Sequence, residues 1–352
     1  MISKVLSKER LPSVLEKLKA SYRLYVPVEK GDIVEFKMLE GDEKPAFEFQ
    51  NSRLSPKFLM EPQSEKMFEF STDPSEENAG ILKEVPREYP PWLVVGIRPC
   101  DAKAIQLVRK NFDNPEYRDL YWVKRFEAAT LVGYGCNDPC AACFCTSVEC
   151  GPFHEEGLDA LMADLGEAYL LRALTEKGES LLSGVEGEPA DKAQLKQAET
   201  LRETAEHKIK SRVPTDKLAK QDLMNLFEAK FWDDIAFSCI NCGTCTFLCP
   251  TCWCFDIQDE ARGGHGIRLR NWDACMFPLF TLHGSGHNPR DAKTQRVRQR
   301  FMHKLKYYVD KYGNGVACVG CGRCVQHCPV NIDIRRVFEI MNNYVPAACE
   351  TA

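Results

Sequence analysis

The sequence lacks the features of a membrane or secreted protein. It contains no run approaching the roughly 18 apolar residues that would cross a bilayer. Its first ten residues include four charged side chains and show no apolar core or cleavage site of a secretion signal. The net charge of −5 is too small to predict a polyanionic or membrane partner. We therefore expect a cytoplasmic chain with no membrane span and no nucleic-acid partner.

Signatures of nucleotide binding and of nucleophilic catalysis are also missing. No Gly-x-Gly-x-x-Gly fingerprint follows a predicted strand, because the glycines of 263–266 come after a polar stretch. There is no P-loop, and no nucleophile has an evident partner base. The sequence therefore predicts no flavin or nicotinamide site of its own and no catalytic residues.

Cysteine, in contrast, is abundant, with 18 residues in a chain of 352. Eight of them form two runs, Cys239–Pro250 and Cys318–Pro329, and both runs read C-x2-C-x2-C-x3-C-P. This is the ferredoxin-type signature of a pair of [4Fe–4S] clusters. Zinc is more often held by two separated C-x2-C pairs, and disulfides need an oxidising compartment. The doubled run therefore predicts two clusters in a reducing and anaerobic cytoplasm.

The ligands of the two clusters follow from the same spacing. In two-cluster proteins, the fourth cysteine of each run binds the cluster of the other run. We therefore assign the first cluster to Cys239, Cys242, Cys245 and Cys328, and the second to Cys318, Cys321, Cys324 and Cys249.

Two continuous apolar runs predict an α/β unit in the N-terminal half. Residues 92–97 and 128–134 have the composition of buried parallel strands, and a helix is expected between them over 102–111. A helix is expected over 1–20, and short strands over 22–28, 33–39, 46–49, 58–60 and 67–70. Further on, 155–235 is expected to be mostly helical, including 158–171 and 190–212.

A second group of cysteines follows these two strands. Cys100 and Cys136 come directly after them, at the sheet edge where open α/β sheets bind ligands. The next loop can return Cys143 and Cys145 to the same place. The four predict a third iron–sulfur site, with a zinc site and unligated core cysteines as the alternatives. Cys140 and Cys150 lie in the same segment and could replace any of the four.

The length of the chain predicts about two domains. We place the boundary in the helical connector near 215–230, which gives an N-terminal α/β domain with a short parallel sheet (1–225) and an α-helical ferredoxin-like dicluster domain (226–352). The predicted fold class is α+β. The two cysteine runs are separated by 250–317, and we expect helices rather than hairpins there to support the clusters.

Other chemically distinctive residues receive plainer interpretations. Cys252 and Cys254 are expected to pack or hydrogen-bond near the first cluster, and Cys275 and Cys349 to have no metal role. Glycines break the helix between His283 and His287, which favours a loop over a zinc site. A basic stretch follows, which comprises Arg290, Lys293, Arg296, Arg298, Arg300, Lys304 and Lys306. We expect it to form a solvated helix face. Alternatively, its cations offset the thiolate charge and dock a redox partner.

Taken together, the motifs resemble an iron–sulfur subunit family. The family includes the iron–sulfur subunit of anaerobic sulfite reductase, the beta subunit of archaeal sulfhydrogenase and related components of flavin-oxidoreductase modules associated with heterodisulfide reductase. The resemblance covers most of the chain and is carried by seven segments: Gly96–Asp101, Cys143–Cys145, Pro250–Asp256, Asn271–Met276, Gly286–Arg290, Arg298–Phe301 and Cys318–Cys324. Cys140 and Cys150 depart from the glycine-rich loop expected there.

The resemblance implies a role in electron transfer within a hetero-oligomer. A member of this family passes electrons between an NAD(P)H-linked FAD flavoprotein and a terminal catalytic subunit of the sulfite reductase, hydrogenase or heterodisulfide reductase type. The residues leave two other functions open. One is a reductase in its own right, with substrate chemistry at the N-terminal cysteine site, and the other is an interaction or nucleic-acid module with structural clusters.

Overall fold

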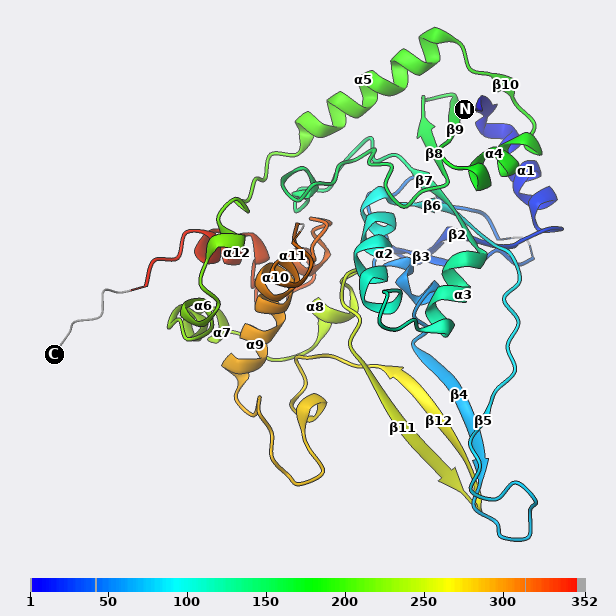
Figure 1. The fold of residues 1–352 in the computed structure, drawn as a ribbon. Helices are drawn as coiled ribbons and strands as arrows, with labels where there is room; N and C mark the ends of the chain where they lie inside the picture. The colour runs from blue at the N-terminus through cyan, green and yellow to red at the C-terminus, as the bar shows by residue number, and fades with distance from the viewer. Residues whose placement is uncertain (1, 42, 314, 347–352) are drawn as a thin grey trace.

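The computed structural model describes residues 2–41, 43–313 and 315–346, and these contain two β-sheets and a set of short helices (Figure 1). The larger sheet has eight strands in the order β10-β1-β9-β8-β7-β6-β2-β3. The smaller sheet has four, in the order β11-β12-β4-β5. Both cysteine runs lie among the helices that follow residue 222. The predicted mixture of helices, a partly parallel sheet and a dicluster region is therefore confirmed, whereas the boundary at residue 225 stays a prediction.

The centre of the larger sheet is parallel. β6 (Trp92–Ile97) pairs with β7 (Ala129–Tyr134), and every residue of both strands is buried. Such strands are apolar throughout because both faces of the sheet are covered. Parallel pairing continues to β2 (Arg23–Lys30) on one side and β8 (Ala160–Asp164) on the other. The chain passes from β6 to β7 through α2 (Pro99–Phe112), which corresponds to the helix predicted over 102–111, and through a second helix that was not predicted, α3 (Leu120–Ala128).

The outer strands of this sheet are antiparallel, and one of them replaces a predicted helix. β8 forms a hairpin with β9 (Ala168–Ala173), so the helix expected over 158–171 is wrong. Its leucines have helical spacing, but the turn at Gly166, whose φ is 104°, returns the chain along β8. Of the predicted helical segment 155–235, helices occupy α4 (Glu176–Ser183), α5 (Lys192–Lys208), α6 (Leu223–Phe227) and α7 (Phe231–Ala236).

The N-terminal segment differs from its predicted pattern in three places. The expected helix over 1–20 is reduced to α1 (Leu11–Leu18), because residues 3–7 form strand β1 (Ser3–Ser7) beside β9. Residues 46–49 are not a strand, and Pro56–Leu59 forms a 3-10 turn where a strand was expected. The strands expected over 22–28, 33–39 and 67–70 correspond to β2, β3 (Ile33–Met38) and β4 (Ser64–Ser71). β10 (Glu188–Pro189) pairs with β1.

The smaller sheet extends away from the body of the molecule, at the lower right of Figure 1. It joins β4 and β5 (Lys83–Glu84) to a hairpin of β11 (Phe255–Arg262) and β12 (His265–Trp272). The hairpin occupies the start of the segment between the cysteine runs, so the expectation of helices without hairpins there is wrong. Its second strand also brings 265–271 into register with 64–71, which no local pattern could indicate.

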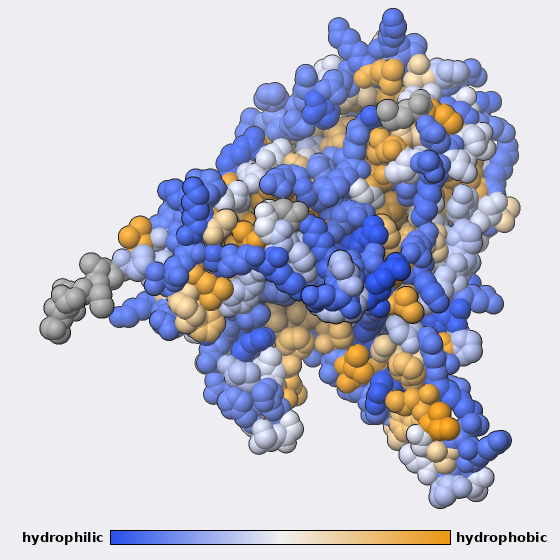
Figure 2. All heavy atoms as spheres, in the orientation of Figure 1, coloured by the Kyte–Doolittle hydropathy of each residue, from blue (hydrophilic) through white to orange (hydrophobic). Residues whose placement is uncertain are grey.

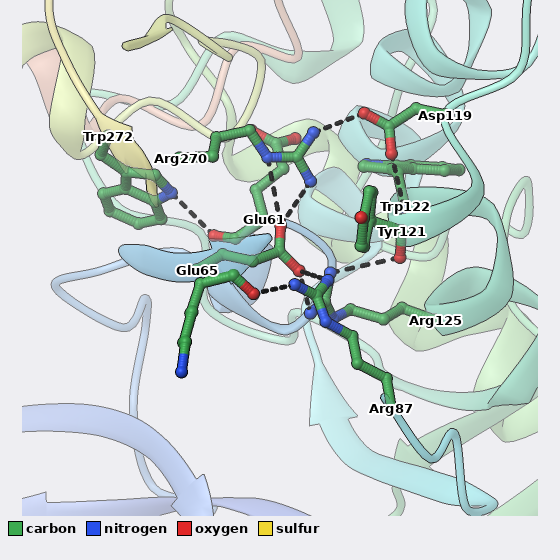
Figure 3. A network of polar contacts seen from close by, with 10 residues as sticks. Glu61, Glu65, Arg87, Asp119, Tyr121, Trp122, Arg125, Arg270 and Trp272 are labelled. Atoms are coloured by element: carbon green, nitrogen blue, oxygen red, sulfur yellow. Dashed lines mark hydrogen bonds and ion pairs between the residues drawn. The ribbon is translucent and has the colours of Figure 1, made fainter. Parts of the chain in front are cut away.

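A buried carboxylate fastens the smaller sheet to helix α3 (Figure 3). Glu65 of β4 accepts hydrogen bonds from Arg270 of β12, from Arg125 of α3 and from Arg87. Arg270 also pairs with Asp119, which caps the first turn of α3. Burial of one anion among three guanidinium groups is stable only because each charge has a partner. The five residues therefore fix the position of the hairpin relative to α3.

The helical region packs around its own apolar core, which includes the fully buried Trp232 and Phe338. Its elements are α8 (Thr244–Phe247), α9 (Lys293–Met302), a π-helical turn over His303–Tyr307, α10 (Tyr308–Tyr312), α11 (Arg323–Gln326) and α12 (Ile334–Asn342). None of the helices in the described ranges is both long enough and apolar enough to cross a bilayer.

Candidate metal centres

The two cysteine runs adopt the same local conformation. In the first, Gly243 has a φ of 74° and precedes α8; in the second, Gly322 has a φ of 76° and precedes α11. This left-handed backbone favours glycine. A Cβ atom on Gly243 would also lie 2.8 Å from the ring of Phe277. The sequence repeat is thus a structural repeat, in which each loop turns sharply into a short helix after its second cysteine.

The first cavity gathers the four cysteines predicted for one cluster. Cys239, Cys242, Cys245 and Cys328 all line it, so the last cysteine of the second run lies with the first three of the first run. The rest of the wall is largely apolar and includes Met276, Val297, Phe301 and Ile334. Cys242 is exposed, whereas the other three are half-buried. Four thiols in a mostly apolar pocket fit the ligand set of a cubane cluster.

The second group lies deeper. Cys318, Cys321 and Cys249 are buried and Cys324 is half-buried. Burial, and then the negative charge of Cys249, raise the pKa of the Cys318 thiol to about 12. Cys249 behaves in the opposite way, because a hydrogen bond from Cys252 and the cation of Lys304 lower its pKa. The structure thus brings Cys249 to the second run, as the predicted ligand set requires. Cys252 lies next to Cys249, and therefore beside the second group rather than the first.

The basic stretch supplies buried cations to these groups, so its interpretation as a solvated helix face is wrong for much of its length. Arg296, Arg300, Lys304 and Lys306 are all buried, along α9 and the π-helical turn after it. Arg300 donates from Nη2 to the carbonyl oxygen of Cys245 at 3.3 Å. Lys304 donates to Thr251 Oγ1 at 2.7 Å. The alternative interpretation, in which cations offset the thiolate charge, agrees with this geometry.

The N-terminal cysteines form a third group at the edge of the larger sheet. Cys100, Cys136, Cys143 and Cys145 line one cavity, together with Arg98 and Cys321. Cys140 and Cys150 do not line it within the described residues; Cys140 Sγ lies 3.9 Å from the carbonyl oxygen of Cys321, and Cys150 packs beside Cys145. The four cysteines favoured by the sequence are therefore the ones that the fold brings together.

Arg98 fixes the strand ends that carry this third group. Its Nη1 atom donates to the carbonyl oxygens of Tyr134 and Gly135 at 3.2 and 3.0 Å, and its Nη2 atom donates to that of Phe49. The guanidinium also lies over the rings of Phe49 and Tyr134. The end of β6 is thereby tied to the end of β7, which places Cys100 and Cys136 side by side.

The third group adjoins the second cysteine run. Arg323 of that run forms a bidentate pair with Asp101, with Nη1–Oδ1 and Nη2–Oδ2 distances of 2.6 and 2.7 Å. Both side chains are almost completely buried. A Cβ atom on Gly320 would lie 2.5 Å from the backbone nitrogen of Cys145, and the nitrogen of Phe144 donates to Gly320 at 2.9 Å. Sequence reasoning missed the pair of Asp101 and Arg323, whose two residues belong to different motifs.

Among the described residues, Cys254, Cys275 and the two neighbouring histidines singled out in the sequence lie outside the three cysteine groups. Cys254 and Cys275 lie together, and a hydrogen bond from Cys275 lowers the pKa of Cys254 to about 7. Cys275, which was predicted to have no metal role, thus hydrogen-bonds to a second thiol. His283 and His287 lie on a loop with ring centroids 5.4 Å apart. Cys349 lies outside the described residues.

Within residues 2–41, 43–313 and 315–346, no three or more His, Cys, Asp or Glu side chains are positioned to hold a single metal ion.

Comparison with known proteins agrees with this geometry. Residues 238–332 match the family model of a 4Fe-4S dicluster domain. Over 340 residues, the chain is 29% identical to "Sulfhydrogenase 2 subunit beta" of Pyrococcus furiosus, and the match covers 95% of this chain and 96% of the relative. The predicted resemblance to a sulfhydrogenase beta-type iron–sulfur subunit is confirmed. No solved structure matches the chain.

The dicluster domain match includes both cysteine runs and the cations between them, so it supports [4Fe–4S] clusters as the cofactor of this region. It begins after the N-terminal cysteines and leaves their role open. The similarity to the sulfhydrogenase subunit does extend across that part of the chain.

Proposed function

We propose that this chain is an iron–sulfur electron-relay subunit of a multi-subunit oxidoreductase. Two [4Fe–4S] clusters would be bound by the two sets of four cysteines predicted from the runs. A third would be bound by Cys100, Cys136, Cys143 and Cys145. We propose that the third cluster belongs to an N-terminal domain, 1–225, and the other two to a C-terminal domain, 226–352. The observation that carries the proposal is that the chain forms three groups of four thiols, each beside the next.

The contacts between the groups give the relay an order. Cys321, assigned to the second run, also lines the cavity of the N-terminal group. Cys324, from the same run, lines the cavity of the first run. The second-run group therefore lies between the other two. Because tunnelling becomes steeply slower with distance, electrons would pass from one end group to the other through this middle group.

The exposed end of the relay is at the first run, where Cys242 reaches the surface. A relay only passes electrons on, so it needs both an electron donor and an electron acceptor. Each cluster takes one electron at a time. We propose an NAD(P)H-linked FAD flavoprotein as one partner and a terminal subunit of the hydrogenase, sulfite reductase or heterodisulfide reductase type as the other. The relative from Pyrococcus furiosus is itself a sulfhydrogenase subunit, which supports a hetero-oligomer.

The number and spacing of the cysteines support a reducing environment, because eight of the 18 stand in the two cluster-type runs. Thiolates serve as cluster ligands, and they persist in the cytoplasm because disulfides are rare there. We therefore place the protein in the cytoplasm of an anaerobic cell.

The test is the metal and sulfide content of protein purified without oxygen, with a Cys100→Ser variant alongside. We expect about twelve irons per chain in the parent and about eight in the variant, with acid-labile sulfide in proportion. A Cys140→Ser variant serves as the control and should keep about twelve irons. About eight irons in both the parent and Cys100→Ser would refute the third cluster, and zinc in their place would establish a structural zinc site.

A further inference from the structure

Two buried cations beside the cysteines lack a carboxylate partner. Arg300 and Lys304 are each 3% exposed and lie one helical turn apart. In the described part of the chain, neither forms an ion pair with an aspartate or glutamate, whereas the neighbouring Lys306 pairs with Asp310 at 2.8 Å. An unpaired buried cation is costly to the fold. The negative charge that offsets Arg300 and Lys304 must therefore come from the cysteine groups.

Arg300 lies between the two groups of the dicluster domain. It lines the cavity of the first-run group and donates to the carbonyl oxygen of Cys245. The same cavity wall includes Cys324, which is assigned to the other cluster. The Nε atom of Arg300 is buried without a hydrogen-bond acceptor from the protein. A donor in this position is free to interact with a group bound in the cavity.

Lys304 lies at the second-run group alone. Its Nζ atom donates to Thr251 Oγ1 at 2.7 Å, and that hydroxyl is 3.3 Å from Cys249 Sγ. Nζ also donates to the carbonyl oxygen of Ala317 at 3.2 Å, directly before Cys318. Cys249 and Cys318 are both assigned to the same cluster. The two cations are thus placed differently, with Arg300 at both clusters and Lys304 at one.

We propose that Arg300 and Lys304 set the reduction potentials of the dicluster: Arg300 raises both potentials, and Lys304 raises only that of the cluster at Cys249 and Cys318. This inference rests on the proposed function, since it requires the clusters to be present. Reduction adds one electron, supplied by the redox partner, to a group that is already negative. A nearby cation stabilises the reduced form, and its effect is strong where water is excluded.

The experiment is an anaerobic redox titration of the full chain followed by electron paramagnetic resonance, with iron content measured in parallel. Arg300→Met should lower the reduction potential of both clusters. We expect the equilibrium constant for reduction of each cluster to fall about tenfold, which corresponds to about 59 mV for one electron. Lys304→Met should lower one potential by a similar amount and leave the other unchanged. Arg300→Lys, which keeps the charge, should restore most of the shift.

Arg298→Met is the matched control. Arg298 is on the same helix, but its guanidinium lies 3.5 Å from the centre of the Phe227 ring and its Nη1 donates to the carbonyl oxygen of Phe227 at 3.0 Å. Unchanged potentials in Arg300→Met, or an equal shift in Arg298→Met, would overturn the inference without affecting the relay. If Arg300→Met loses iron, Arg300→Gln is titrated in its place. Loss of iron from Arg300→Gln as well would show that Arg300 has a structural role, and would overturn the inference. Absence of iron from the parent protein would refute the proposed function instead.

Discussion

At the scale of single residues, the most consequential contact is the buried pair of Asp101 and Arg323. It joins the first turn of α2 to the second cysteine run, 222 positions away in the sequence. Asp101→Ala would leave the Arg323 cation buried without its partner, which costs about 3–5 kcal/mol. We expect the free energy of unfolding in urea to fall by that amount under anaerobic conditions. Glu339→Gln, which removes the exposed pair with Arg336, should cost less than about 1 kcal/mol, and equal losses in both variants would contradict this assignment.

At the scale of helices and strands, local patterns predicted what local sequence determines. The apolar runs of β6 and β7 are continuous because both faces are buried, so their composition alone identified them. The cysteine spacing likewise identified the two loops, because cluster geometry constrains them locally. The region 158–171 was misread because its leucines suit a helix as well as a hairpin, and pairing with β7 and β1 decides between the two. Pairing of β12 with β4 depends on residues about 200 positions apart and has no local signal.

The attachment of the smaller sheet gives a prediction at this same scale. Glu65→Gln would remove the carboxylate that Arg87, Arg125 and Arg270 share, leaving buried cations with reduced compensation (Figure 3). We expect faster amide hydrogen exchange in β4 and β12, with β6 and β7 unchanged. The control is Asp259→Asn on the same hairpin, because its pair with Arg268 is largely exposed and contributes little. Equal protection of β4 in both variants would show that strand pairing alone holds the sheet.

At the scale of the whole molecule, the surface shows where such a chain can meet partners. Apolar atoms occur as separate patches over a mostly hydrophilic face in Figure 2. The exposed large apolar side chains of the helical region include Phe237, Ile240 and Leu279. Ile240 also lines the cavity of the first-run group, where Cys242 is exposed. Exposed apolar side chains there agree with docking of a redox partner at the first-run end of the proposed relay, since the centres of protein interfaces are depleted in charge.

The order of the three cysteine groups makes the last prediction. If the second-run group lies in the middle, its reduced cluster should couple magnetically to both neighbours, because spin–spin interaction weakens steeply with distance. Cys100→Ser should remove one coupling from the electron paramagnetic resonance spectrum of the fully reduced protein and keep the coupling within the dicluster. A double Cys318→Ser and Cys321→Ser variant should remove both couplings and leave two isolated signals. Persistent coupling between the two end clusters in that variant would contradict a linear order, and would mean that electrons can bypass the middle group.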